Sequence, residues 1–287
     1  MRPTNNNLSP LPFYESTRLQ YPNLPYPYGN DICLIAPKDI LLPFQLAFAS
    51  KADASLAIFL VPVCADKRAR NITKEMKEAG LTVVTLSDYS SDILIFPARL
   101  PMPLDMEKGK YYLLVNYGGE ARYSEIMTVV DSLSGYTEIE WYDKEDMPYD
   151  GGAVIYSRQG YRNRLYVQTI IANPEYKFEE DGEERDGYYF PEKQLSEKTY
   201  KCKFLTTESV CDMLRVARLS DFVTVKDQYG RIYECDTFLT NVEWETGGVA
   251  NVECEFETST VVKRIGKFVN VSDKADFNMD FNKDYYQ

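Results

Sequence analysis

The sequence predicts an all-β protein, mainly strands with one or two short helices: an immunoglobulin-like β-sandwich followed by a second β-sandwich or β-barrel domain. Two patterns predict this class. Across residues 31–131, short runs rich in β-branched and aromatic residues are separated by turn residues. Across residues 132–266, several runs alternate strictly between apolar and polar residues, so each strand has one buried face and one wet face.

The first β domain, residues 31–131, contains about seven of these runs, among them "LAIFLVPVC" and "KYYLLVNY". That many short strands in about 100 residues is typical of an immunoglobulin-like or fibronectin-like sandwich. The Cys…Trp…Cys signature is missing, so the prediction concerns architecture alone. One helix interrupts the strands at "NITKEMKEAG", with Asn71 as its N-cap and Gly80 at its end.

The second β domain, residues 132–266, has the cleaner periodicity. A helix over about residues 206–218 interrupts it, because Val210, Met213, Leu214 and Ala217 form an apolar stripe after the candidate N-cap Thr206. From the alternation, we expect these strand residues to face the core: Ile139, Trp141, Leu165, Val167, Tyr200, Cys202, Phe204, Val252, Cys254 and Phe256.

The two ends of the chain have neither the apolar alternation of a strand nor the apolar stripe of a helix. Residues 1–30 hold six prolines with Tyr21, Tyr26 and Tyr28 between them, which excludes a helix or a central strand and predicts an extended arm. The arm is either a floppy leader or a segment that lies on a neighbouring subunit, and the interleaved rings favour the second reading slightly. Residues 267–287 form a polar, flexible tail that is disordered or docks on a partner through rings such as Tyr285 and Tyr286.

Composition excludes several classes of function. The chain has 32 basic and 44 acidic residues, a net charge of -12, so phosphate backbones and anionic lipid repel it and we expect neither nucleic acid nor a membrane as partner. Histidine is absent, which excludes Ser-His-Asp and Cys-His catalysis and His-ligated metals. The N-terminus has no apolar stretch typical of a Sec signal, so we expect synthesis and folding in the cytoplasm.

Cysteine spacing argues against a zinc site. The chain has 6 Cys and no CxxC motif, and Cys202 and Cys254 fall on apolar strand phases. We therefore expect buried free thiols, which fit a reducing compartment.

Two acidic clusters are candidate sites. In "EWYDKEDMPYDGG", the carboxylates of Asp143, Glu145, Asp146 and Asp150 lie close to aromatic residues, which is compatible with a glycan hydrolase. An acidic loop between strands explains the same residues and is the favoured reading, so we expect no catalytic residue.

The second acidic cluster lies in "EEDGEERDG", which lacks the frame of an EF-hand. Its acids, Glu179, Asp181, Glu183 and Asp186, offer at most an unspecific oxygen site. We expect no metal and no cofactor.

The stretch from Lys177 to Phe204 ends in a strand, and its earlier part is predicted to be a solvated loop of about 25 residues. Two Asp-Gly pairs supply its turns, but a plain linker does not need its three consecutive rings. We therefore expect the rings to cover a neighbouring subunit or domain. Together with the rings of the two ends, they form the candidate interaction surface: Tyr21, Tyr26, Tyr28, Tyr188, Tyr189, Phe190, Tyr285 and Tyr286.

Six runs between residues 110 and 266 carry a resemblance to a known group of proteins. They are "YGGEARYSEIMTV", "IEWYD", "YRNRLYV", "EERDGYYFPEKQLSEKTYKCKFL", "VCDMLRVARLSDFVTVKDQYGRIYECDTFL" and "VECEFETSTVVKRIG". Together they resemble the uncharacterised structural proteins of tailed phages and prophages of gut Bacteroidetes. The resemblance implies a virion role at the tail or its baseplate, with assembly in the host cytoplasm. The group has no established catalytic residues to carry over.

These observations lead to one expected function and two alternatives. We expect a non-enzymatic structural subunit that forms homo-oligomers and binds other virion proteins. The first alternative is a carbohydrate-binding or adhesive surface module of a gut bacterium, so a glycan is a further candidate partner. The second is a carboxylate-based glycan hydrolase.

Overall fold

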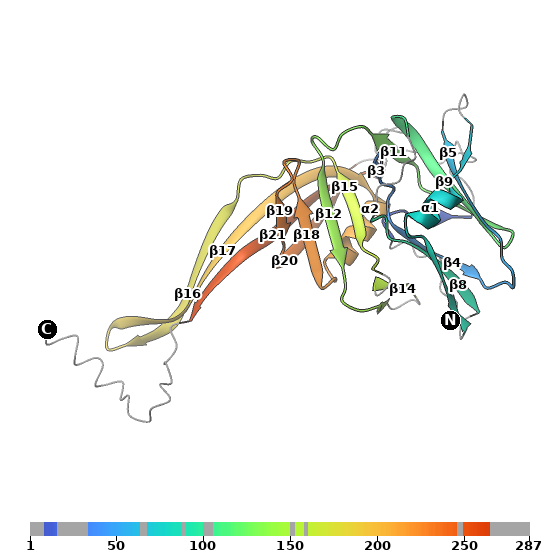
Figure 1. Ribbon diagram of the computed structural model, residues 1–287. Coiled ribbons are helices and arrows are strands. Elements are labelled where there is room, and N and C mark those ends of the chain that lie inside the picture. The colour runs from blue at the N-terminus through green and yellow to red at the C-terminus, as the bar shows by residue number, and fades with distance from the viewer. Residues whose placement is uncertain are drawn as a thin grey trace. The chain divides into compact units, whose positions relative to one another are not determined.

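The computed structural model describes residues 9–15, 34–63, 68–87, 90–99, 106–149, 153–157, 160–245 and 249–264. Most of these residues lie in strands, and two helices occur among them, α1 (Thr73–Glu78) and α2 (Glu208–Ala217) (Figure 1). The prediction of an all-β fold with one or two short helices is confirmed.

Two sheets form the N-terminal part of the fold. The larger has the strand order β1-β10-β9-β11-β3, with β5 joined to β9 and β6 joined to β5. Its strands are β1 (Phe13–Tyr14), β3 (Leu34–Pro37), β5 (Leu56–Pro62), β6 (Arg70–Asn71), β9 (Gly109–Tyr117), β10 (Glu120–Ser124) and β11 (Met127–Val130). The smaller sheet has the order β4-β8-β7, from β4 (Phe44–Ala49), β7 (Thr82–Leu86) and β8 (Ser91–Phe96).

Aromatic contacts join these two sheets. The ring centroids of Phe13 on β1 and Phe44 on β4 lie 4.9 Å apart, and those of Phe48 on β4 and Tyr117 on β9 lie 5.2 Å apart. The central strand of the smaller sheet, β8, has every residue buried. Two sheets that share an apolar interior in this way make a β-sandwich.

Part of the expected N-terminal arm belongs to the core of its own chain. Leu11 is fully buried, Phe13 is nearly so, and β1 pairs with β10 at the edge of the larger sheet. Pro10 and Pro12 lie before β1, so neither is required to donate a backbone hydrogen bond in the sheet. The prediction of an arm free of the fold is therefore wrong for residues 9–15, and Tyr21, Tyr26 and Tyr28 lie outside the described residues.

The second group of strands forms a four-stranded sheet with the order β15-β12-β18-β19. Its strands are β12 (Thr137–Tyr142), β15 (Asn163–Val167), β18 (Phe222–Lys226) and β19 (Ile232–Glu234), and a small hairpin of β13 (Met147–Tyr149) and β14 (Ala153–Ile155) follows β12 in sequence. The side chains predicted to face inward, such as Ile139, Trp141 and Leu165, are all buried. The alternation therefore predicted these inward positions correctly. It was wrong in making the opposite face wet throughout, because Glu140 and Tyr166 on that face are also buried.

Both helices lie where the sequence places them. The Asn71 side-chain oxygen accepts hydrogen bonds from the backbone N–H and the hydroxyl of Thr73 at the start of α1, although Ile72 is the N-cap residue. Helix α2 follows Thr207, one residue after the predicted cap. Its predicted apolar stripe is buried in full: Val210, Met213, Leu214 and Ala217.

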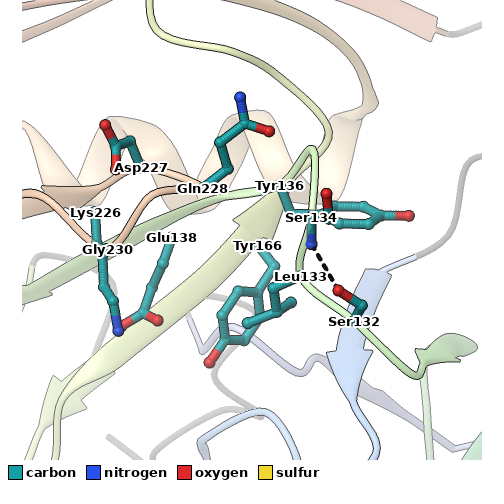
Figure 2. Close-up of a pocket in the computed structure, with 10 residues that line it drawn as sticks. All are labelled: Ser132, Leu133, Ser134, Tyr136, Glu138, Tyr166, Lys226, Asp227, Gln228 and Gly230. Atoms are coloured by element: carbon teal, nitrogen blue, oxygen red, sulfur yellow. Dashed lines mark hydrogen bonds between the residues drawn. The ribbon is translucent and has the colours of Figure 1, made fainter.

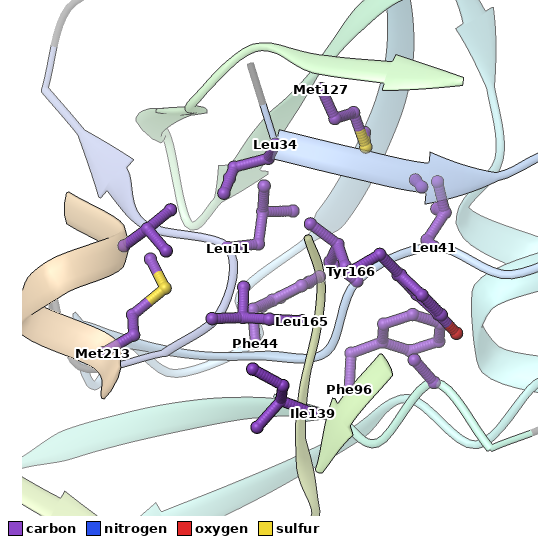
Figure 3. Packing of buried hydrophobic residues seen from close by; sticks show 14 of the residues in the cluster. Leu11, Leu34, Leu41, Phe44, Phe96, Met127, Ile139, Leu165, Tyr166 and Met213 are labelled. Atoms are coloured by element: carbon purple, nitrogen blue, oxygen red, sulfur yellow. The ribbon is translucent and has the colours of Figure 1, made fainter. Parts of the chain in front are cut away.

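One hydrophobic core serves both parts of the chain. Leu11, Leu34 and Phe44 from the first part pack in the same cluster as Ile139 and Met213 from the second (Figure 3). We expected separate domains at 31–131 and 132–266, but the structure divides the chain elsewhere. One compact unit comprises Met1–Glu175 and Thr199–Ser259, and the other comprises Tyr176–Lys198 and Thr260–Gln287.

The expected loop at residues 177–199 is a long β-hairpin, so this prediction is wrong. Strand β16 (Glu175–Arg185) and strand β17 (Tyr188–Thr207) belong to a sheet with the order β16-β17-β21-β20, together with β20 (Thr237–Trp244) and β21 (Val249–Arg264). Asp186 and Gly187 form the turn, with φ of +51° and +82°. Two residues with positive φ are what a type I′ hairpin turn requires, and Asp-Gly is among its preferred sequences.

The first Asp-Gly pair is not a turn. Gly182 lies inside β16, where a Cβ atom would overlap the carbonyl oxygen of Phe190 and lie 2.8 Å from the Cα of Pro191. Glycine is therefore required there by the close approach of the neighbouring strand.

Candidate functional site

Exposed aromatic rings gather on the segment Tyr176–Lys198, which we call the aromatic hairpin. Five of its side chains are large, aromatic and exposed, with exposed fractions from 37% for Phe190 to 72% for Tyr188. They are Tyr176, Phe178, Tyr188, Tyr189 and Phe190. Clusters of exposed apolar residues often mark interaction sites, whereas single exposed apolar residues are common on any protein surface.

The rings lie on both faces of the hairpin. Successive side chains of a strand point to opposite faces, so Tyr188 and Phe190 share one face of β17 while Tyr189 lies on the other. Tyr176 and Phe178 share a face of β16 for the same reason. A ring on either face is therefore available to a partner.

The hairpin is also acidic. Tyr176–Lys198 contains eight carboxylates and four basic side chains, a net charge of -4. Some of these charges are already engaged: the Lys198 ammonium lies 5.9 Å from the centroid of the Tyr176 ring, and the Gln194 amide donates to Glu180 at 3.2 Å. The excess of acid favours a partner surface that is basic.

The predicted candidate surface is only partly described. Tyr188, Tyr189 and Phe190 are exposed on the hairpin, whereas Tyr285 and Tyr286, like the three tyrosines of the N-terminal arm, lie outside the described residues. Sequence reasoning missed Tyr176 and Phe178. Their spacing of two residues was a usable signal, but it has meaning only once residues 175–185 are recognised as a strand.

In the first acidic cluster, Asp143 makes hydrogen bonds that connect two strands. Asp143 is buried at the end of β12 and accepts a hydrogen bond from the backbone N–H of Asp221 at 3.0 Å. The Asp221 carboxylate in turn accepts one from the Lys144 backbone at 3.1 Å. Burial, with the nearby Asp221 carboxylate, raises the pKa of Asp143. These bonds tie the end of β12 to the start of β18.

The remaining acids of that cluster do not join Asp143 in its buried position. Glu145 is exposed, Asp146 is half-buried, and Asp150 lies outside the described residues.

The second acidic cluster lies along one strand. Glu179, Asp181 and Glu183 occur at alternate positions of β16, and Asp186 lies in the turn. Within the described ranges, no group of three or more His, Cys, Asp or Glu side chains is placed to hold a metal ion. No helix in the described part of the chain is long and apolar enough to cross a membrane.

The structure describes four of the six cysteines, and all four are free: Cys202, Cys211, Cys235 and Cys254. Cys202 on β17 and Cys254 on β21 are buried on neighbouring strands. A hydrogen bond with Cys202, together with burial, raises the pKa of the Cys254 thiol. The expectation of buried free thiols is confirmed for this pair, and a thiol with a raised pKa is a poor nucleophile.

A second candidate site is a pocket of about 320 Å³, which we call the β12 pocket and which has both polar and apolar lining (Figure 2). Its wall comes from the segment before β12, from β12 and β15, and from the turn between β18 and β19. The lining residues are Ser132, Leu133, Ser134, Tyr136, Glu138, Tyr166, Lys226, Asp227, Gln228 and Gly230. The volume is at the lower end of the range for pockets that bind small molecules, about 300–1,000 Å³.

Charge in the pocket is nearly balanced. Glu138 lies opposite Lys226 in the register of β12 and β18, and its carboxylate is 3.3 Å from the Arg164 guanidinium. Asp227 is committed to its own turn, because it accepts from the backbone N–H groups of Tyr229 and Arg231, each at 2.9 Å. Its carboxylate also pairs with the Arg231 guanidinium at 2.6 Å.

The neutral groups of the pocket are held in place as well. The Gln228 side-chain oxygen accepts from the backbone N–H of Gly135 at 3.0 Å, which fixes the amide and leaves its NH₂ group as a donor. Ser132 accepts from the backbone N–H of Ser134 at 3.1 Å (Figure 2). Burial, and then the Glu138 carboxylate, raise the pKa of Tyr166 to about 12, so its hydroxyl keeps its proton at neutral pH.

Sequence reasoning did not single out this pocket. Its residues come from three stretches separated by about 30 to 60 positions, and only the pairing of β12 with β15 and β18 brings them together. Compared with protein-family models and with curated proteins, the chain gives no significant match.

Proposed function

We propose that this chain is a non-enzymatic structural subunit of a phage or prophage particle, associated with the tail or its baseplate. It assembles with copies of itself and with other virion proteins in the host cytoplasm. The observation that supports an assembly role is the aromatic hairpin, whose five exposed rings occur on both faces of paired strands. The tail or baseplate assignment follows from the resemblance in residues 110–266.

Leaving these rings exposed to water is unfavourable. Aromatic side chains bury large apolar areas, and burial of apolar surface contributes roughly 25 cal/mol per Å². Tyr, Phe and Trp are accordingly enriched at the centres of protein interfaces, where a few of them contribute most of the binding free energy. The hairpin therefore carries the residue types of an interface centre, and its carboxylates supply a polar rim.

Assembly can be measured with the purified protein and the proteins that neighbouring genes encode. We expect light scattering to detect either self-association or a complex with at least one of these proteins. The triple variant Tyr188→Ser, Tyr189→Ser, Phe190→Ser should weaken that association by about 30-fold or more, since loss of even one central aromatic residue costs about 2 kcal/mol or more.

Tyr229→Ser is the matched control. Tyr229 is 74% exposed but lies in the turn after β18, outside the aromatic hairpin, so this substitution should leave assembly unchanged. A wild-type protein that stays monomeric and binds none of its neighbours would overturn the proposal. So would a triple variant that assembles as tightly as the wild type.

A further inference from the structure

We propose that the β12 pocket binds a small neutral polyhydroxylated molecule, of the size of a monosaccharide or disaccharide. The inference rests on the lining of the pocket and is independent of the assembly role, because no lining residue belongs to the aromatic hairpin. The volume of about 320 Å³ admits a ligand of this size and excludes a large oligosaccharide from full enclosure.

The polar groups of the pocket match hydroxyl groups. A hydroxyl donates one hydrogen bond and accepts others, so a ligand rich in hydroxyls needs acceptors and donors side by side. The Glu138 carboxylate is an acceptor, and the Lys226 ammonium and the Gln228 NH₂ group are donors. The protonated Tyr166 hydroxyl can do both.

The balance of charge favours a neutral ligand. The Glu138 carboxylate is paired with the Arg164 guanidinium and that of Asp227 with Arg231, while Lys226 lies opposite Glu138 in the strand register. An anionic ligand would meet the Glu138 carboxylate, and a cationic one would meet Lys226, each at an unfavourable Coulomb energy. A ligand without formal charge avoids both.

The apolar part of the wall completes the argument. Tyr136, Tyr166 and Leu133 offer ring and aliphatic surfaces beside the polar groups (Figure 2). Such surfaces cover the C–H faces of a sugar ring, while the polar groups around them fix its orientation. Because Glu138, Tyr166 and Lys226 are residues of paired strands, their backbone positions are set before a ligand arrives, which lowers the entropic cost of binding.

Saturation-transfer NMR and calorimetry on the full chain test the proposal. The probes are glucose, galactose, N-acetylglucosamine, cellobiose and lactose. We expect at least one of them to bind and to receive saturation from tyrosine ring protons. Glu138→Gln and Lys226→Met should each weaken that binding by about tenfold or more, because each removes a hydrogen bond to a charged group, worth about 1.5–3 kcal/mol.

The controls separate binding from folding and from assembly. Glu243→Gln neutralises an exposed carboxylate on β20, outside the pocket, and should leave saccharide binding unchanged. Lys226 is exposed, so Lys226→Met gives a folded variant even if loss of the Glu138–Arg164 ion pair destabilises Glu138→Gln. Failure of every probe to bind would overturn the inference, as would binding that both pocket variants leave intact. The triple aromatic variant should bind the saccharide normally.

Discussion

Asp92 shows how a buried charge is accommodated in the N-terminal β-sandwich. It is buried on β8, yet its carboxylate accepts hydrogen bonds from Tyr117 at 2.7 Å, Thr85 at 2.8 Å and Ser50 at 3.2 Å. Burial alone would raise the pKa of Asp92, but these hydrogen bonds outweigh it and lower the pKa below its ordinary value of 3.8. Burial and the same carboxylate raise the pKa of Tyr117 to about 12.

We predict that Asp92→Asn destabilises the protein and flattens its response to acid. A carboxylate with a lowered folded-state pKa stabilises the fold at pH values above its ordinary pKa of 3.8. That contribution is lost as the pH falls from there through the lower folded-state pKa. The asparagine lacks the charge and presents an NH₂ group to hydroxyl donors, so we expect a loss of about 1.5–3 kcal/mol at pH 7.

Urea unfolding of both proteins between pH 2.5 and pH 7 measures this. The difference in unfolding free energy should be largest near pH 7 and shrink toward the acid end of the series. A difference that stays constant across the series would show that the charge of Asp92 makes no contribution.

The sequence predicted inward-facing residues better than it predicted polar contacts. Alternation identified Trp141 and Cys202 correctly, because a strand with one buried face repeats every two residues. It could not identify Asp92, which lies in the apolar run "SDILIF". Its partners come from different elements, and no local pattern records which of them meet in the folded chain.

The strands of the aromatic hairpin were also not predicted from local pattern. Both of its faces are largely exposed, so its strands lack the apolar alternation by which the other strands were recognised. The Asp186-Gly187 turn was the informative signal, since Asp-Gly between two extended runs favours a two-residue hairpin. The ends of helix α2 were predicted within about two residues. Its apolar residues recur at helical spacing because one face of the helix is buried.

We predict that Gly187→Val disrupts this hairpin and that Asp186→Asn preserves it. Both positions have positive φ, which costs a residue with a side chain about 1–2 kcal/mol and is least tolerated by a β-branched one. Asn-Gly is a favoured type I′ sequence, so Asp186→Asn retains the turn.

Hydrogen exchange of the β16 backbone amides is the measurement. Protection should fall by about tenfold in Gly187→Val, in proportion to the lost free energy, and should remain at the wild-type level in Asp186→Asn. Equal protection in the wild type and in Gly187→Val would contradict a turn at these two residues.

For the whole molecule, the sequence predicted two β domains and the structure has one shared core. The alternation within a strand predicts which of its faces is buried. It does not predict which other element packs on that face. Ile139 and Leu165 therefore looked like the interior of a second domain, although they pack in one cluster with Leu11 and Phe44. The division that the structure does make separates Tyr176–Lys198 and falls inside the single strand β17.

That division leads to a prediction about folding and assembly. Among the described residues, no member of the hydrophobic core cluster belongs to Tyr176–Lys198. We therefore expect that replacing residues 178–195 with Asn-Gly, which closes a shorter hairpin, changes the unfolding free energy by no more than about 0.5 kcal/mol. In thermal unfolding this corresponds to a shift of about 2 °C or less.

Met213→Ala is the contrasting variant. Met213 is fully buried on α2, and truncation of a buried methionine costs about 2–5 kcal/mol, so this variant should unfold well below the wild type. In assembly assays the order should be reversed: the shortened protein loses its partners, while Met213→Ala keeps them at temperatures where it is folded. If the shortened protein unfolded as early as Met213→Ala, the hairpin would be part of the folding core. Its exposed rings would then need an explanation within the chain, since stability and partner binding could no longer be assigned to different residues.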